Sequence, residues 1–159
     1  MGAGGAVREF GVFIVVQPGS IVVDRLECCT PYALMALRIA AALLFIEHGT
    51  QKLIGFPAPP EAGLPPVGAL FWIGAWIELV GGTLVLLGLF TRPAAFIASG
   101  QMAVAYWMFH APAIPYPVLN GGDAAILFCF VFLLLVFAGP GAWSVDGRLR
   151  RRCARRGTP

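Results

Sequence analysis

The sequence predicts an all-α integral membrane protein, an antiparallel up-down bundle of four transmembrane helices with both termini in the cytoplasm. Hydrophobic residues make up 58% of the chain and charged residues only 12%, about half of the charged fraction of ordinary soluble domains. The mean hydropathy is +0.81. The apolar residues also fall in blocks long enough to cross a hydrocarbon core, and turns rich in proline and glycine separate these blocks. We therefore expect the solvent of most of the chain to be lipid.

The chain begins with a mixed segment and then enters its first predicted span. Residues 1–29 form an N-terminal extension that we expect to be interfacial or poorly ordered, because its apolar stretch, residues 10–16, is too short to span. The first span is predicted over residues 31–53. Thr30 is a suitable N-cap, and Pro31 is suited to the first helical position, where its missing N–H costs nothing.

Three further spans follow from the same reading. The second is predicted over residues 67–89, after a loop whose five prolines exclude a helix. The third is predicted over residues 93–110 and opens at Pro93. The fourth is predicted over residues 121–138, with Asn120 as its cap. Together the four spans form one transmembrane domain, residues 30–147.

The distribution of basic residues predicts the orientation of these spans. Residues 148–159 form a tail that contains six of the eleven basic residues of the chain. A nucleic-acid patch is the alternative interpretation, but a basic tail directly after an apolar helix favours the positive-inside rule and no nucleic-acid partner. Arg92, in the turn between the second and third spans, then also faces the cytoplasm, and the two outer loops contain no lysine or arginine. We expect a multi-pass protein with both termini inside.

The four cysteines give no sign of a redox or metal centre. They are Cys28, Cys29, Cys129 and Cys153, and none of them forms a Cys-x-x-Cys pair or lies at metal-ligand spacing from a histidine. Adjacent cysteines such as Cys28 and Cys29 rarely form a disulfide with each other, because the geometry strains the peptide between them. The sequence therefore predicts no dithiol centre and no metal site.

Ionisable side chains within apolar spans are costly and usually functional, and this chain has several. The predicted topology brings most of them to the outer end, with Glu78 apart and deeper, near the middle of the membrane. A carboxylate, Glu47 or Asp123, is expected to neutralise the cations there. The candidate catalytic residues are His48, Lys52, Glu78, His110 and Asp123. The candidate polar residues that would bind a cofactor in the same pocket are Glu47, Gln51, Gln101 and Asn120.

Each of these features also has an ordinary structural interpretation. Asn120 and Asp123 suit a capping box, and Lys52 suits a side chain that reaches the headgroups. The histidines and Gln101 suit hydrogen-bonded packing residues. Glu78 fits such an interpretation least, because an acid in the middle of an apolar span needs a partner. Four glycines are predicted to make close contacts between helices: Gly81, Gly82, Gly88 and Gly100.

The same residues resemble the DoxX family of membrane proteins. His48-Gly49-x-x-Lys52-Leu53 resembles the family's H-G-x-x-K-L signature, and Asn120-Gly121-Gly122 resembles its N-G-G-E motif, with Asp123 in place of the glutamate. Further similarity includes Gly81-Gly82, residues 87–95, Met102, Ala105, His110, Pro112, Gly139-Pro140-Gly141, Ser144 and Asp146, and the whole match covers residues 34–147. This resemblance implies a four-helix protein of the inner membrane. It implies a shared site at His48, Lys52, His110, Asn120 and Asp123.

The resemblance also implies a function, a subunit of a membrane oxidoreductase linked to quinone or thiol chemistry. The cofactor stays open at this point: a quinone suits the pocket, since histidine and carboxylate groups exchange protons with a quinol, and haem is not expected. A partner redox subunit would then complete the enzyme, and glycine-rich faces are compatible with a homo-oligomer. Two alternatives stay open: a scaffold that binds partners without catalysis, and a proton-coupled transporter of small molecules.

Overall fold

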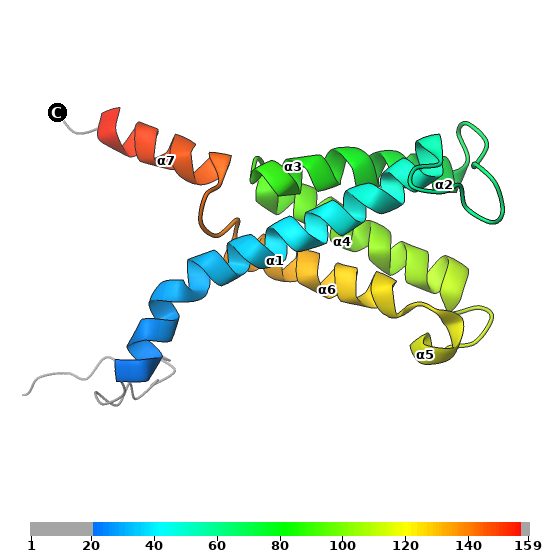
Figure 1. Ribbon diagram of the computed structural model, residues 1–159, viewed down its shortest axis with the longest axis horizontal. Coiled ribbons are helices and arrows are strands. Elements are labelled where there is room, and N and C mark those ends of the chain that lie inside the picture. The colour runs from blue at the N-terminus through cyan, green and yellow to red at the C-terminus, as the bar shows by residue number, and fades with distance from the viewer. Residues whose placement is uncertain (1–20, 157–159) are drawn as a thin grey trace, which may run out of the picture.

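The computed structural model describes residues 21–156, with side chains over residues 26–152. This part of the chain is helical and contains no strand, which confirms the predicted all-α class. Figure 1 shows the arrangement of the helices. In chain order they are α1 (Ile21–Ile54), α2 (Leu70–Trp76), the π-helical turn η1 (Ile77–Gly81), α3 (Gly82–Leu87), α4 (Thr91–Ala105), the π-helical turn η2 (Tyr106–His110), α5 (Pro117–Asn120), α6 (Asp123–Ala138) and α7 (Val145–Arg156).

The first helix begins earlier than predicted. It starts at Ile21 and contains Pro31, so the expectation that Thr30 caps it and Pro31 opens it is wrong. The Thr30 hydroxyl bonds the Leu26 carbonyl at 3.5 Å, as threonine does inside a helix. Proline within a helix removes one hydrogen bond and bends the axis, and α1 turns away from the other helices at about this point (Figure 1). Residues 1–20 of the predicted extension lie outside the described residues.

The remaining helices lie close to the predicted spans. Helices α2, η1 and α3 form one continuous segment, and α4 continues directly into η2. The prediction that Asn120 caps the fourth span is wrong. Asn120 instead ends the short helix α5, while Gly122 is the N-cap residue of α6 and makes no side-chain cap bond. The Asn120 Oδ1 accepts the Gly122 N–H at 2.7 Å, so it holds the turn between α5 and α6.

The helices pack lengthwise against one another. Helix α1 lies along the segment formed by α2, η1 and α3, and α6 packs along α4 (Figure 1). Aromatic rings join α1 to α6, where the buried rings of Phe45 and Phe132 lie 4.7 Å apart between centroids. Two ends can be distinguished. The α5 end carries the loop of residues 55–69 and helix α5, and the α7 end carries the start of α7.

Two of the four glycines predicted to pack closely do so. A Cβ at Gly82 would lie 2.8 Å from a side chain of α1, and one at Gly88 would collide with the Arg38 guanidinium. Gly88 also has φ +67°, which a larger residue adopts only with strain. The prediction is wrong for Gly81, whose nearest neighbour belongs to its own helical segment, and for Gly100, which has no atom within 4 Å of a built Cβ.

A buried arginine holds the α7 end together. Arg38 is 1% exposed, and its guanidinium donates to the carbonyls of Val85 and Leu86 at 3.2 Å and of Trp143 at 3.3 Å. The first two carbonyls lie at the C-terminus of α3, where the Val85 carbonyl also accepts the Gly88 N–H at 3.1 Å. Arg38 therefore satisfies a helix end and ties the segment before α7 to α1.

Asp146, in the first turn of α7, attaches that helix to the start of α4. Its carboxylate accepts the N–H groups of Phe90 and Thr91 and the Thr91 hydroxyl, each at 2.9 Å. Burial raises the pKa of Asp146, but these hydrogen bonds, with the charge of Arg150, together lower that pKa below its usual value. Helix α7 includes most of the predicted tail and continues to Arg156. The contacts of Asp146 fix the first turn of α7 to the start of α4.

The surface of the described part is strongly apolar. Within it, Leu26–Ile54 and Leu70–Leu87 are long and apolar enough to cross a membrane, and Asp123–Ala138 is a shorter apolar helix. Large apolar side chains are exposed along the helices, for example Leu43, Phe96, Phe130 and Phe137. Contiguous apolar surface of this kind is unusual for a protein in water and suits contact with lipid.

Candidate functional site

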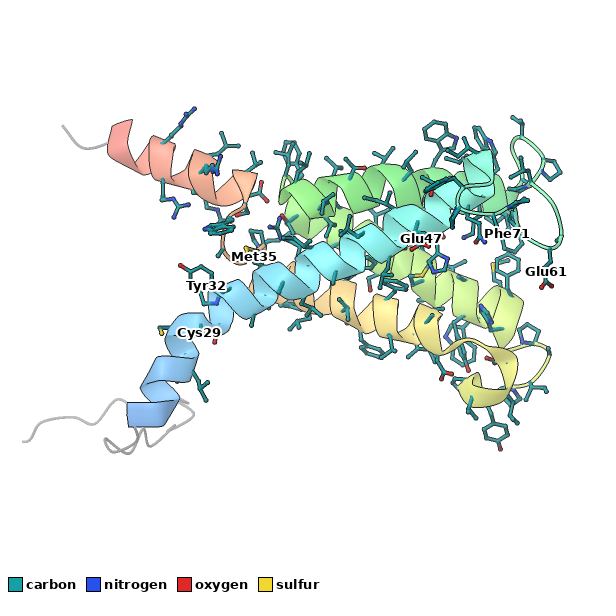
Figure 2. All side chains as sticks on the ribbon, viewed as in Figure 1. Cys29, Tyr32, Met35, Glu47, Glu61 and Phe71 are labelled. Carbon is teal, nitrogen blue, oxygen red and sulfur yellow. The ribbon has the colours of Figure 1, made fainter. Side chains whose placement is uncertain are left out.

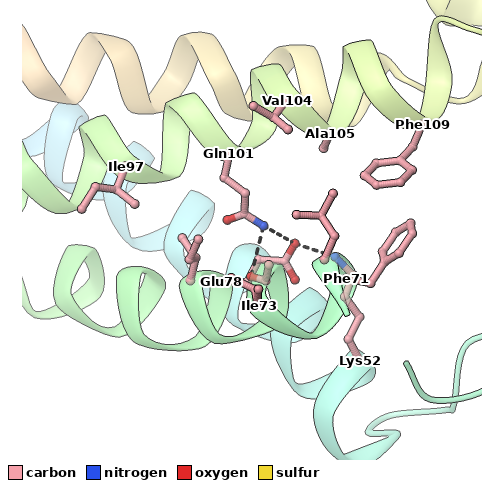
Figure 3. A pocket seen from close by; sticks show the side chains of 12 residues that line it. Lys52, Phe71, Ile73, Glu78, Ile97, Gln101, Val104, Ala105 and Phe109 are labelled. Atoms are coloured by element: carbon pink, nitrogen blue, oxygen red, sulfur yellow. Dashed lines mark hydrogen bonds and ion pairs between the residues drawn. The ribbon is translucent and has the colours of Figure 1, made fainter. Parts of the chain in front are cut away.

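The centre of the candidate site is a buried ion pair between two helical segments. Glu78, in the π-helical turn η1, is 1% exposed, and the Lys52 Nζ, from the last turn of α1, lies 2.5 Å from its Oε1. The Gln101 amide of α4 donates to the same carboxylate oxygen at 3.0 Å and to the Gly74 carbonyl at 3.1 Å. Figure 3 shows this chain of contacts from α1 through η1 to α4. One carboxylate therefore connects three helical segments.

A glycine that sequence reasoning did not single out allows these segments to approach. A Cβ at Gly49 would lie 2.8 Å from the Leu79 nitrogen, 2.9 Å from the Ala75 oxygen and 3.1 Å from the Glu78 Cβ. Since two of these are backbone atoms, any side chain here would push α1 away from η1. The signal was present in the sequence, because Gly49 lies between His48 and Lys52 in the H-G-x-x-K-L pattern.

The partner of Lys52 differs from the one expected. The sequence predicts Glu47 or Asp123 as its neutralising partner, with Glu78 apart, but Lys52 pairs with Glu78. Side chains in a helix point back towards its N-terminus. Because α1 and the α2–η1 segment run in opposite directions, Lys52 points away from the α5 end and Glu78 points towards it. The two side chains therefore meet, although the sequence positions of the two residues place their Cα atoms at different depths along the helix axes.

Two cavities meet at this ion pair. The first, here called the α2–α4 cavity, has a volume of about 230 Å³ and lies between α2 and α4. Its polar end is formed by Lys52, Glu78 and Gln101. The remaining walls are apolar and consist of Leu70, Phe71, Ile73, Gly74, Ile77, Ile97, Val104, Ala105 and Phe109.

The second, here called the central cavity, has a volume of about 270 Å³ and is lined by residues of α1, α4, η2 and α6, with one residue each from α2 and η1. It is lined by His48 and His110 as well as by Lys52 and Glu78. The rings of Phe71 and Phe109 line both cavities, and their centroids lie 4.3 Å apart. The ion pair and this ring pair therefore form the partition between the two spaces.

The two histidines differ in how they are held. The His110 Nδ1 lies 3.0 Å from the Asn120 carbonyl oxygen, which can only accept, so Nδ1 carries the hydrogen. In the neutral ring, Nε2 is then an acceptor. His48 is exposed on α1, and its ring meets the Phe128 ring edge-on at 6.0 Å between centroids. Both rings border the central cavity beside the ion pair.

The other predicted site residues lie outside the network of Lys52, Glu78 and Gln101. Glu47 and Asp123 are exposed, Asp123 in the first turn of α6, where its charge favours the helix N-terminus. The Asn120 amide donates to the Ile114 carbonyl at 2.6 Å and so shapes the loop. Gln51 is half-buried on α1. None of these four lines either cavity, and the described residues contain no group of three or more histidine, cysteine or acidic side chains placed to hold a metal.

Comparison with known proteins identifies the family. A family model described as DoxX matches residues 33–111. A protein of Haemophilus influenzae, named only as uncharacterised, is 41% identical over 133 residues, which cover 81% of this chain and 99% of that protein. The chain belongs to the DoxX family.

Two further relatives carry names that give a location. The inner membrane protein YphA of Escherichia coli is 32% identical to this DoxX protein over 74% of this chain and 91% of its own length. The inner membrane protein YqjF of the same species is 27% identical over 74% of this chain and 92% of its own length. No solved structure matches. The lipid bilayer is therefore the environment of this DoxX protein.

The family match and the cavities coincide in the chain. Residues 33–111 include Lys52, Glu78 and Gln101, and they also include His48 and His110. Asn120 and Asp123, which lie outside both cavities, also lie outside the matched range. The polar residues of the candidate site thus lie in the part that matches the family model, whereas one wall of the central cavity, formed by α6, lies beyond it.

Proposed function

We propose that this DoxX protein crosses the inner membrane four times, as an up-down bundle with both termini in the cytoplasm. The spans would be α1, the α2–η1–α3 segment, the α4–η2 segment and α6. Arg92 and Arg150 of α7 line one pocket at the same end of the molecule, which supports a cytoplasmic α7 end under the positive-inside rule. The Lys52–Glu78 pair would then lie in the outer half of the membrane.

We infer that the protein binds a membrane quinone or its quinol as a subunit of an oxidoreductase. The observation that carries this proposal is the buried network of Lys52, Glu78 and Gln101 at one end of an otherwise apolar cavity between two helices. A ring with polar substituents and an apolar tail suits such a space, since the tail stays in lipid while the head reaches the polar end. A buried acid without a cavity would support packing alone.

The residues around the network have separate roles in this proposal. Lys52 pairs with the Glu78 carboxylate, and this contact offsets part of the cost of burying a charge. The Gln101 amide fixes the position of one carboxylate oxygen, which leaves the other oxygen for a ligand. Glu78 would accept a proton from a bound quinol, and the histidines of the central cavity would exchange protons with the outer side.

Electrons would pass to or from a partner subunit. The chain has no Cys-x-x-Cys pair, so the partner would carry the group that changes oxidation state, a flavin or a reactive thiol pair. Oxidation of one quinol would release two electrons, which this partner accepts, and two protons, the first to Glu78 and the second to a histidine of the central cavity. The DoxX protein itself would supply the binding site and the proton acceptor.

Quinone content of the purified protein tests this function. The protein is purified from its native membrane in a mild detergent, and bound quinone is extracted into organic solvent and measured by chromatography. We expect about one quinone per chain in the natural protein, and much less in the Lys52→Met, Glu78→Leu double variant. Thr83→Ala is the matched control, since its hydroxyl bonds only the Leu79 carbonyl of its own segment.

The same measurement separates this proposal from a scaffold. A scaffold would retain its fold and partners but yield no more quinone than the double variant or an unrelated membrane protein. Equal quinone content in the natural protein and the double variant, with both folded, would exclude the proposed binding site.

A further inference from the structure

We propose that the α2–α4 cavity selects a head group that donates hydrogen bonds, and hence the reduced quinol over the oxidised quinone. The inference rests on the proposed function and names the form of ligand that the same site takes. Two residues that line this cavity each have one buried polar atom without a hydrogen-bond partner among the described residues, Glu78 Oε2 and Gln101 Oε1. Both are acceptors.

The amide orientation at Gln101 follows from its neighbours. Its Nε2 lies 3.1 Å from the Gly74 carbonyl oxygen and 3.0 Å from the Glu78 Oε1. Both neighbours can only accept, the carbonyl always and the carboxylate while it is ionised beside Lys52. A reversed amide would place an oxygen against two acceptors. The nitrogen is therefore fixed on this side, and the amide oxygen is left as an acceptor on the other.

The second acceptor belongs to the most deeply buried acid of the site. Glu78 is 1% exposed, and its contacts with Lys52 and Gln101, drawn in Figure 3, both end on its Oε1. Its Oε2 keeps its lone pairs without a donor. A buried acceptor left unsatisfied costs more free energy than a typical hydrogen bond contributes. A ligand that supplies a donor removes this cost, and its binding is strengthened accordingly.

The hydrogen-bond donors of the site depend less on a ligand than the two acceptors do. The Gln101 Nε2 already donates to two acceptors, the Gly74 carbonyl and the Glu78 Oε1. The Lys52 ammonium has further N–H groups, but its side chain is 24% exposed and borders the central cavity as well. Those groups can be solvated without a ligand, whereas no group of the described residues donates to the two buried acceptors.

These properties distinguish chemically similar ligands. A quinol hydroxyl donates to Glu78 Oε2 or to Gln101 Oε1, whereas a quinone carbonyl, which only accepts, would face their lone pairs. An anionic head group would meet the same lone pairs and the charge of the carboxylate. Selection of the ligand involves binding alone, so no covalent bond is made or broken.

Titration calorimetry of the protein in nanodiscs tests the selection. The probes are decylbenzoquinol, kept reduced under nitrogen, decylbenzoquinone, dodecane-1,2-diol and dodecane. We expect the quinol to bind at least tenfold more tightly than the quinone, and the diol to bind where dodecane does not. Gln101→Met, which removes one of the two acceptors, should reduce the preference for quinol, and Thr83→Ala should leave it unchanged.

The outcomes separate this inference from the proposed function. Quinone binding as tight as quinol binding would overturn the selection and leave the quinone site in place. Binding of the diol without either form of the benzoquinone would support a donor-selective site and overturn the quinone function. Binding of none of the probes, or of dodecane as tightly as the diol, would overturn the inference. Because the comparison of probes uses the natural protein, it holds even where a variant fails to fold.

Discussion

Lys52 of α1 and Glu78 of η1 form an ion pair at 2.5 Å between Nζ and Oε1, with the carboxylate buried and the lysine partly exposed. Glu47 lies on the same helix as Lys52 and is exposed (Figure 2). The pair lies where two cavities meet and where three helical segments contact one another. Its energetic role and its binding role can be tested separately.

The first prediction concerns the energy of the pair. Lys52→Met leaves the buried carboxylate without its cation, and we expect it to lower the free energy of unfolding by about 3 kcal/mol. Lys52→Met combined with Glu78→Leu removes both charges and should recover most of that loss. Denaturant unfolding of the purified variants measures both values. Glu78→Leu alone completes the comparison. If the double variant loses as much unfolding free energy as the two single variants added together, the two residues do not depend on each other.

The second prediction concerns Gly49. Gly49→Ala would bring a Cβ to within 2.9 Å of backbone atoms of the facing segment, which can move only with its helix. We expect a loss of roughly 1–3 kcal/mol in unfolding free energy, the usual cost of overpacking. The control is Gly100→Ala, since its Cβ would meet no atom within 4 Å and alanine favours a helix. Equal stability of the two variants would contradict the close approach of α1 to η1.

The third prediction concerns the pH dependence of stability through Asp146. Its pKa is lowered in the folded protein, so its contribution is present above its ordinary pKa and is lost as the pH falls through the folded value. Asp146→Asn should therefore be less stable than the natural protein at pH 7, and the difference should disappear in acid. Thermal unfolding of both proteins against pH measures this. The control is Asp123→Asn, at an exposed helix start, which should differ less from the natural protein. If the stability difference between Asp146→Asn and the natural protein grows in acid, the proposed role of the Asp146 carboxylate is wrong.

The fourth prediction concerns topology. In a background without cysteine, Glu61→Cys lies in the loop at the α5 end, and Arg150→Cys lies in α7. A membrane-impermeant maleimide should label the former in intact spheroplasts and the latter only after the membrane is opened. Labelling of Arg150→Cys in intact spheroplasts would contradict a cytoplasmic α7 end.

The sequence predicted the helical class well because it depends on composition and on where proline and glycine interrupt apolar runs. It placed Lys52 and Glu78 in one protein interior but not in contact, since depth counted along Cα atoms ignores the direction in which side chains point. It also missed the start of α1, because Pro31 suits both a first helical turn and a bend within a longer helix.

The π-helical turns were beyond sequence reasoning. Such a turn adds one residue to a helix locally, and the apolar pattern on either side is still that of an α-helix. The turn η1 contains Glu78, and η2 contains His110, so both fall at the candidate site. Gln101 was assigned to hydrogen bonding between helices, and the contact exists, but its role in orienting Glu78 depends on the three-dimensional arrangement.

The most direct test of the site is photolabelling with a benzoquinol that carries a diazirine next to its ring, followed by mass spectrometry of the labelled peptides. We expect label in residues 70–78 and 97–109, the walls of the α2–α4 cavity, and its loss when unlabelled decylbenzoquinol is added in excess. Label spread evenly over the apolar helices, and unchanged by the competitor, would contradict a quinol site in this cavity.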